Sequence, residues 1–219
     1  MADFNPSYLG PRPDIIALIP KRCRRILDVG CATGSVGRAL KEARKDVHVT
    51  GVELDPEMAA VSGQRLDVVE KGDICDLLAH GVFDDRAYDC IILADVLEHI
   101  VDPWTTLGLL AARLGHDGVI VASLPNVRHY TTIASILFAK RWPYRDRGIH
   151  DRTHLRFFAY RNVVELFEGA GLMIGSLRRH YRILEAPYRV NRLSRVLALP
   201  PLRDLLTFQY LIVAKAKSE

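Results

Sequence analysis

The stretch GIHDRTHLRFF, from Gly148 to Phe158, gathers two histidines, an aspartate and two arginines within eleven positions. His150 and His154 lie four residues apart, a spacing that would place both on one face of a helix. Imidazole suits general-base chemistry near neutral pH and also binds metals. Arginine pairs with anionic oxygens. By itself the stretch is compatible with a metal site, an acid–base centre, an anion clamp or a structural corner.

A second group of residues lies in ILDVGCATGSVG, Ile26–Gly37, where an apolar run leads into a glycine-rich turn. Such a turn lets the backbone approach a ligand closely at a helix N-terminus. The pattern is Asp28-x-Gly30-x-Ala32-x-Gly34 and not the G-x-G-x-x-G of a dinucleotide-binding turn. An acid before the first glycine would repel a pyrophosphate, but it suits the ammonium group of a methionine moiety. The residues therefore favour S-adenosylmethionine over a dinucleotide.

Two further acids close the next two apolar runs. Glu53 ends HVTGVEL, where a carboxylate can accept hydrogen bonds from both ribose hydroxyls. Asp73, in the pattern GDI, follows the third run, where it could accept from an adenine amino group. Three acids at three successive strand ends form a much stronger pattern than one glycine-rich turn.

These side chains need a scaffold that brings successive strand ends to one edge of a sheet. Near-continuous apolar strands alternate with helices, which predicts a parallel sheet covered on both faces, the doubly wound α/β architecture. Asp55-Pro56 and Asp102-Pro103 are each typical of a helix start, with proline at the first helical position. Helices are also expected over Ser35–Arg44, Val127–Ala139 and Arg161–Ala170. The expected strands are Arg25–Gly30, His48–Leu54, Leu66–Asp73, Tyr88–Asp95, Gly118–Pro125, Met173–Arg182 and Phe208–Ala216.

The composition of the 219 residues is that of a globular protein, with 49% hydrophobic and 26% charged residues. We expect one domain, 1–219, with a basic insertion around 126–206. Between Lys140 and Arg195 there are 13 Lys and Arg against 5 Asp and Glu, which suggests an anionic partner on that side. The absence of a signal-peptide pattern, a membrane span and paired CxxC cysteines leads us to expect a cytoplasmic protein with reduced thiols.

The segments Ile26–Gly37, GVELDPEM, GDI and ILADVLEHI resemble the successive motifs of class I S-adenosylmethionine-dependent methyltransferases. The resemblance covers roughly Arg25 to Pro125. It implies a Rossmann-like seven-stranded sheet in the order 3-2-1-4-5-7-6, with the last strand antiparallel. It also implies that the cofactor is held by residues at the strand ends, namely Asp28, Gly30, Cys31, Ala32, Gly34, Glu53, Leu54, Asp73, Ile74, Ala94 and Asp95.

DVLEHI resembles the segment of ubiquinone-type O-methyltransferases and small-RNA 3′-end methyltransferases that can hold a divalent metal. Asp95, Glu98 and His99 match those positions, and Mg²⁺ there would help to deprotonate an acceptor hydroxyl. The alternative is that Glu98 and His99 only brace the following helix. We expect no metal, and keep this set as the one that could hold Mg²⁺.

SLPNVRHY followed by GIHDRTHLRFF resembles methyltransferases of polysaccharide biosynthesis and, more distantly, MetW-type proteins. The resemblance implies a hydroxyl or phosphate of a sugar or glycan intermediate as acceptor, either nucleotide-linked or lipid-linked. Among the histidines that could take the acceptor proton (His99, His129, His150 and His154), His154 is the first choice, with Asp151 as its orienting carboxylate and His99 as a further catalytic residue. The stretch would form a lid whose anion contacts come from Arg152 and Arg156.

Arg192–Leu206 reads as a basic amphipathic segment that could lie on an anionic membrane surface or pack on the core or a dimer partner. Two other functions remain open at this point. The first is a MetW-like protein that binds the cofactor without transferring a methyl group. The second is an RNA methyltransferase, although we do not expect a nucleic-acid partner because no added RNA-binding module is present. The oligomeric state stays open.

Overall fold

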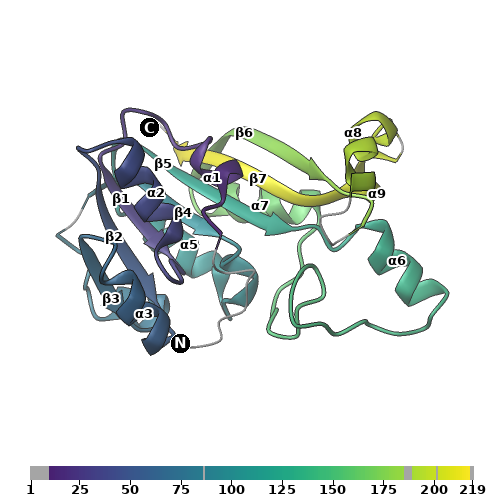
Figure 1. Ribbon diagram of the computed structural model, residues 1–219, viewed down its shortest axis with the longest axis horizontal. Helices are drawn as coiled ribbons and strands as arrows, with labels where there is room; N and C mark the ends of the chain where they lie inside the picture. The colour runs from purple at the N-terminus through teal and green to yellow at the C-terminus, as the bar shows by residue number, and fades with distance from the viewer. Residues whose placement is uncertain (1–9, 86, 185–188, 201, 218–219) are drawn as a thin grey trace.

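The chain is built around a seven-stranded sheet in the computed structural model, which describes residues 10–85, 87–184, 189–200 and 202–217 (Figure 1). The strand order is β3-β2-β1-β4-β5-β7-β6, and β7 runs antiparallel to both neighbours. The predicted architecture and strand order are thereby confirmed. The strands are β1 (Arg25–Val29), β2 (His48–Glu53), β3 (Val68–Lys71), β4 (Tyr88–Ala94), β5 (Leu114–Pro125), β6 (Leu172–Tyr181) and β7 (Thr207–Ala216).

The parallel part of the sheet brings the carboxyl ends of β1, β2 and β4 together. β1 is central, with Asp28 beside Gly51 of β2 and Ile92 of β4. Glycine is needed in β2 because a Cβ atom on Gly51 would come within 2.7 Å of the Cys31 Sγ atom. The strand order reverses between β1 and β4, and open α/β sheets bind ligands in the crevice at such a point.

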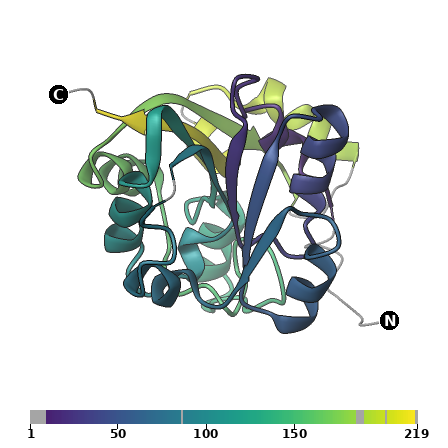
Figure 2. The same cartoon turned by 90° about the vertical axis from the view of Figure 1, so that its left-hand side faces the viewer.

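Helices cover both faces of the sheet, as Figure 2 shows. They are α1 (Pro13–Ile16), α2 (Ser35–Ala43), α3 (Pro56–Ser62), α4 (Ile74–Ala79), α5 (Pro103–Ala111), α6 (Tyr130–Leu137), α7 (Tyr160–Gly169), α8 (Ser194–Leu197) and α9 (Arg203–Leu206). One buried cluster joins α1 and α2 to the sheet through Ile15 and Leu40. The other joins α4, α5 and α7 through Leu78, Leu107 and Phe167. Burial on both faces explains why the strands read as continuous apolar runs.

Both predicted Asp-Pro helix starts are present. The Asp55 side chain accepts hydrogen bonds from the backbone N–H groups of Glu57 and Met58, each at 2.9 Å. Asp102 accepts from the backbone N–H of Thr105 at 3.1 Å. These carboxylates satisfy N–H groups that a helix start would leave without partners.

The boundaries differ from the prediction at β3 and β5. β3 is shorter than Leu66–Asp73 because Asp67 accepts the backbone N–H of Val49 with its side chain and the strand starts only after it. β5 begins at Leu114, four residues before the predicted start.

The chain between β5 and β7 departs most from the sequence-based expectation. α6 is shorter than the predicted Val127–Ala139, since Asn126 holds the preceding turn by accepting the backbone N–H of Arg128 at 3.0 Å. The predicted amphipathic segment Arg192–Leu206 forms short turns, namely η3 (Arg189–Leu193), α8 and α9. The apolar side chains of Leu193, Val196 and Leu197 do not pack on the core, since all three are exposed. Within the described residues, no helix combines the length and apolar character that a membrane crossing would need.

Candidate active site

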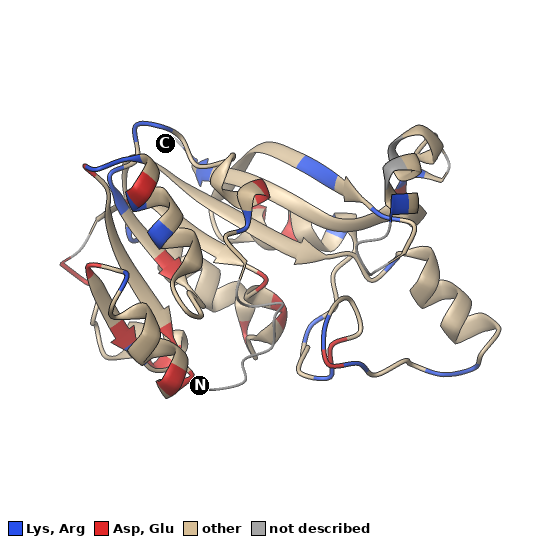
Figure 3. Cartoon of the chain, in the orientation of Figure 1, with Lys and Arg blue, Asp and Glu red and all other residues tan. Residues whose placement is uncertain are grey.

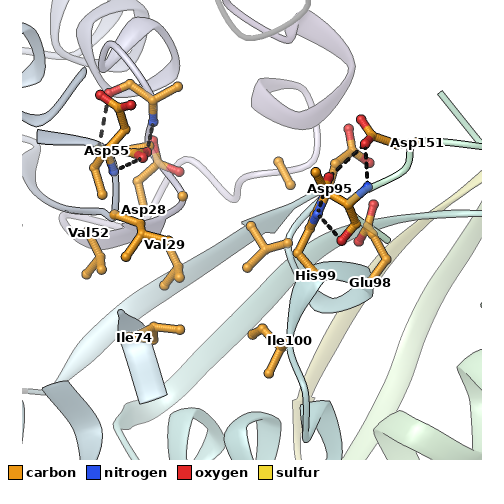
Figure 4. Close-up of a pocket in the computed structure, with 18 of the residues that line it drawn as sticks. Asp28, Val29, Val52, Asp55, Ile74, Asp95, Glu98, His99, Ile100 and Asp151 are labelled. Carbon is orange, nitrogen blue, oxygen red and sulfur yellow. Dashed lines mark hydrogen bonds between the residues drawn. The ribbon is translucent and has the colours of Figure 1, made fainter. Parts of the chain in front are cut away.

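A cavity of about 820 Å³ opens at the carboxyl ends of β1, β2 and β4 (Figure 4). At one end lie Asp28, Glu53 and Asp73 with the turns that carry them, which we call the glycine-turn end. At the other end lie the short helix η2 (Leu97–His99) and residues 147–154, which we call the histidine end. Figure 4 shows Asp28 and Asp55 on one side and Glu98, His99 and Asp151 on the other, with Ile74 and Ile100 below them. The cavity thus joins both segments that the sequence singles out for chemistry.

The residues predicted to hold the cofactor border this cavity, with one exception. The ten that do are Asp28, Gly30, Cys31, Ala32, Glu53, Leu54, Asp73, Ile74, Ala94 and Asp95. Gly34 does not border it, and its expected place around the methionine stays a prediction. It is the N-cap of α2 with φ of 73°, and a Cβ atom there would meet Ser62 and Leu66 at 3.2 Å. Gly34 therefore serves the turn and the helix packing beneath the cavity. For the other ten, contact with a cofactor stays a prediction.

Asp28 supplies a buried negative group at the glycine-turn end. It is 2% exposed, and its Oδ2 atom has no hydrogen-bond partner among the described residues. Burial, and then the nearby charge of Glu53, raise the pKa of Asp28 to about 7. A buried carboxylate oxygen without a partner costs free energy, and a cation in the cavity would remove that cost. The site therefore fits a ligand that brings a positive group to Asp28, as S-adenosylmethionine does.

Glu53 holds the glycine-rich turn in place. Its Oε2 atom accepts the backbone N–H of Ala32 at 2.7 Å, and its Oε1 atom accepts that of Asp55 at 2.9 Å. The first contact fixes Ala32, which has a left-handed φ of 48° that is costly for a residue other than glycine. Each oxygen of Glu53 keeps one lone pair, so the predicted bonds to ribose hydroxyls remain available to it.

Asp73 also has a structural contact in addition to its predicted role. Its Oδ1 atom accepts the backbone N–H of Cys75 at 2.7 Å and so caps α4. This bond fixes the turn that carries Ile74 to the cavity wall.

Asp95 is committed to contacts within the protein. Its Oδ2 atom accepts from Arg12 at 2.5 Å, and its Oδ1 atom accepts from Ser123 at 2.9 Å and from Gln209. The carboxylate therefore ties α1, β5 and β7 together under the cavity. This leaves Asp95 poorly placed as a metal ligand, in contrast to the set Asp95, Glu98 and His99 that the sequence resemblance implied. Arg12 was missed by sequence reasoning because it lies 83 residues from Asp95 in the chain.

A different trio comes together at the histidine end. Ligand atoms of Glu98, His99 and His154 lie within 4.8 Å of one another. The Glu98 side chain is buried, and its Oε1 atom lies 4.0 Å from the Nε2 atom of His154. Burial, and then the charge of Asp95, raise the pKa of Glu98 well above its usual range. The backbone carbonyl of Glu98 accepts the N–H groups of Leu155 and Arg156 at 2.8 and 3.0 Å, which joins η2 to the segment after His154.

Hydrogen bonds orient both histidines of the trio. The Nδ1 atom of His154 lies 3.2 Å from the carbonyl of Ile149, which can only accept, so Nδ1 carries the proton and Nε2 keeps a lone pair. His99 Nδ1 lies 3.1 Å from Thr153 Oγ1, which in turn donates to Asp151 at 2.7 Å. The hydrogen bonds thus differ from the expectation that Asp151 orients His154 directly. Asp151 orients His99 through Thr153, and the Ile149 carbonyl orients His154.

The protonation of His154 suits a base. Burial, and then the neighbouring His99, lower the pKa of His154 below its usual value. At neutral pH the ring is therefore uncharged and can accept a proton on Nε2. The two rings lie with centroids 4.7 Å apart, edge to face.

The other two histidines that were considered lie outside the cavity. His150 is fully buried, with Nε2 at 2.9 Å from Thr132 Oγ1 and its ring against Trp142. His129 is also fully buried, and its Nε2 atom lies 2.9 Å from the carbonyl of Arg182. Both have structural contacts that explain their burial.

The predicted anion contacts through Arg152 and Arg156 are not at the cavity. Arg152 pairs with Asp146 at 2.9 Å. Arg156 lies over the ring of Trp104 and donates to the carbonyl of Val101. The arginine that borders the cavity is Arg147, which directly precedes the stretch Gly148–Phe158. The sequence alone could not predict which of these arginines borders the cavity, because the loop that carries them is not a helix or strand with a regular side-chain period.

The sequence of the chain matches a known family. Residues 4–177 match the family described as methyltransferase domain. The chain belongs to this family, and its fold and glycine-rich turn define it as a class I S-adenosylmethionine-dependent methyltransferase.

Its relatives and structural neighbours agree with that class. The ubiquinone biosynthesis O-methyltransferase of Aeromonas salmonicida is 27% identical over 179 residues, which cover 77% of this chain and 71% of that protein. The protein of that name from Xylella fastidiosa (strain 9a5c) is 32% identical over 126 residues, 55% of this chain and 48% of its own length. This chain thus spans between about half and seven tenths of these two relatives.

Solved structures share the fold. A SAM-dependent methyltransferase from Archaeoglobus fulgidus has a TM-score of 0.61 at 19% identity, covering 89% of this chain and 87% of its own. An S-adenosylmethionine-dependent methyltransferase from Clostridium acetobutylicum has a TM-score of 0.59 at 15% identity, with coverage of 99% and 94%.

Proposed function

We propose that this protein is an O-methyltransferase that transfers the methyl group of S-adenosylmethionine to a hydroxyl group, with His154 as the base. The observation that carries the proposal is that one cavity holds the buried carboxylate of Asp28 at one end and the neutral, oriented His154 at the other. The names of the relatives, as O-methyltransferases, support the choice of an oxygen acceptor.

The residues that border the cavity have distinct parts in this mechanism. S-adenosylmethionine supplies an electrophilic methyl group when bound. Asp28 binds the ammonium group of the cofactor, and Glu53 and Asp73 bind its ribose and adenine. His154 Nε2 would take the proton as the O–H bond of the acceptor breaks, while the oxygen would form a bond to the methyl carbon and the bond from that carbon to the sulfonium sulfur would break, leaving the electron pair on sulfur. Burial and the neighbouring His99 lower the pKa of His154, and the negative charge of Asp151 opposes them and so stabilises the imidazolium that results.

The same trio offers a second way to activate the hydroxyl. Glu98, His99 and His154 present one carboxylate and two imidazoles, a set that suits a transition metal better than Mg²⁺, which prefers oxygen ligands. A metal there would lower the pKa of a bound hydroxyl. Removing metals with EDTA decides between the two: activity is unchanged if His154 is the base, and lost but restored by Mn²⁺ or Zn²⁺ if a metal is needed.

For the acceptor, the site best supports a ring hydroxyl on a largely apolar molecule. Ile100, Val101, Ile149 and Phe208 border the cavity near the histidine end and offer no side-chain hydrogen bonds to a sugar. A ring hydroxyl is also the group that an enzyme of ubiquinone biosynthesis would methylate, as the relatives are named.

A sugar or glycan hydroxyl is the second candidate, as the resemblance of Ser123–Phe158 implies. Arg147 at the cavity and the excess of basic residues between Lys140 and Arg195 support it, since both suit a diphosphate-linked sugar.

Methyl transfer from labelled cofactor to catechol-type phenols and to nucleotide-linked or lipid-linked sugars tests the proposal. We expect transfer to a phenol, with a rate that falls at acidic pH with a midpoint below the usual histidine value of about 6.5. Transfer to sugars alone would select the second candidate. Cofactor binding without transfer to any of these acceptors, together with co-purification of a partner enzyme, would favour a MetW-like role instead.

A further inference from the structure

One end of the molecule exposes large apolar side chains. Leu137 and Phe138 at the end of α6 are 64% and 83% exposed. Val196 and Leu199, in and after α8, are 72% and 66% exposed. Single exposed apolar residues are common on protein surfaces, but neighbouring ones mark a contact surface.

These two segments leave the sheet at the same place. The hydroxyl of Tyr130, at the start of α6, donates to the carbonyl of Ile183 at 2.6 Å, just after β6. Asn126 donates to the carbonyls of Asp204 and Thr207 at 2.9 and 2.7 Å, at the end of α9. Figure 1 shows α6, α8 and α9 together at the end of the molecule farthest from β3. We call α6, the residues up to Tyr144, and the described residues of 189–203 the distal end.

The charges of the distal end have one sign. Neither 127–145 nor 189–203 contains an aspartate or glutamate, while each contains four Lys or Arg residues. In Figure 3, basic segments flank an uncharged α6. Asp204, the next acid along the chain, pairs with Arg179 at 3.3 Å. Apolar side chains fringed by basic ones match a bilayer surface with anionic head groups. A second copy of the chain would bring like charges together.

The distal end is also connected to the cavity. The loop that follows Phe138 carries Tyr144, which is 70% exposed, and reaches Arg147, which borders the cavity. If Phe138 and Tyr144 contact another surface, that contact is therefore only a short way along the chain from Arg147 at the mouth of the cavity.

We propose that the distal end docks on the surface of membranes rich in anionic lipids. α6, with eight residues, is too short to cross a bilayer, so the contact is peripheral. Phe138, Leu137 and Val196 enter the interface, and Lys140 and Arg141 contact the head groups. The proposal does not depend on which acceptor the enzyme methylates.

Vesicle sedimentation with the full chain tests it. We compare phosphatidylcholine vesicles with vesicles in which about a third of the lipid is phosphatidylglycerol. The protein is expected to sediment with the anionic vesicles only, and less as NaCl rises from about 0.1 M to about 0.5 M. Phe138→Ser, and the double change Lys140→Glu with Arg141→Glu, should each weaken the binding by about tenfold or more.

Two matched control variants outside the distal end test whether the effect on vesicle binding is specific to it. Leu109→Ser replaces an exposed apolar residue of α5, and Lys45→Glu replaces an exposed lysine after α2. Both should bind vesicles as the unchanged protein does, and all variants should keep the same cofactor affinity, which excludes unfolding. Absence of binding to anionic vesicles, or equal loss with the controls, would overturn the proposal. So would a dimer in lipid-free solution that Phe138→Ser abolishes, since a second copy would then cover this surface.

Discussion

The two ends of the cavity are built in different ways. At the glycine-turn end, Asp28 and Glu53 lie at the ends of adjacent parallel strands, and Glu53 fixes the turn after β1 through the backbone of Ala32. At the histidine end, η2 and the loop around His154 come from distant parts of the chain and are joined by the carbonyl of Glu98. The regular sheet positions one end, whereas loops tied by a few hydrogen bonds position the other. The glycine-turn end should thus bind the cofactor. The histidine end should perform the proton transfer and select the acceptor.

The largest effect should come from removing the base at the histidine end. His154→Ala should lower kcat by about a hundredfold to ten-thousandfold, the range typical of a lost general base. Steady-state kinetics with labelled cofactor measures this. The control is His116→Ala, because His116 is a highly exposed histidine away from the cavity. A variant that keeps more than half of its activity would exclude His154 as the base.

The buried carboxylate at the other end should appear in the pH dependence of stability. Because burial raises the folded-state pKa of Asp28 to about 7, its penalty is absent below the unfolded value of about 4, grows as the pH rises from about 4 to about 7, and is constant above that. Without cofactor, Asp28→Asn should therefore match the unchanged protein near pH 4 and exceed its stability by up to about 4 kcal/mol at pH 8. Denaturant unfolding at both pH values measures the difference. A gap that is the same at pH 4 and pH 8 would contradict the ionisation of Asp28.

A smaller effect should follow from loosening the second histidine. Thr153→Val removes the hydroxyl that links His99 to Asp151, and should lower kcat by about three- to tenfold. Thr153→Ser keeps the hydroxyl and should restore most of the rate. If serine fails to rescue the rate, the methyl packing of Thr153 matters more than its hydrogen bonds.

The glycine-turn end could be predicted from the sequence better than the histidine end, and the reason is physical. The acids at strand ends are readable because a parallel sheet places successive strand ends at one edge, and Asp28, Glu53 and Asp73 do border one cavity. Gly34 lies outside the cavity wall because its left-handed backbone serves helix packing beneath the turn. At the histidine end, residue type pointed to His99 and His154, which border the cavity, but the sequence did not predict their orientation. The carbonyl of Ile149 and the pairing of Arg12 with Asp95 depend on tertiary contacts that have no local pattern.

We infer that the glycine-turn end binds the cofactor and that the histidine end acts on the acceptor. Calorimetric titration of demethylated cofactor into Asp28→Asn and His154→Ala separates the two ends. Asp28→Asn should weaken binding by about tenfold to a hundredfold, since a buried charge loses its partner, while His154→Ala should bind within about threefold of the unchanged protein. Unaltered affinity in Asp28→Asn, or equal losses in both variants, would show that the two ends do not divide the work in this way.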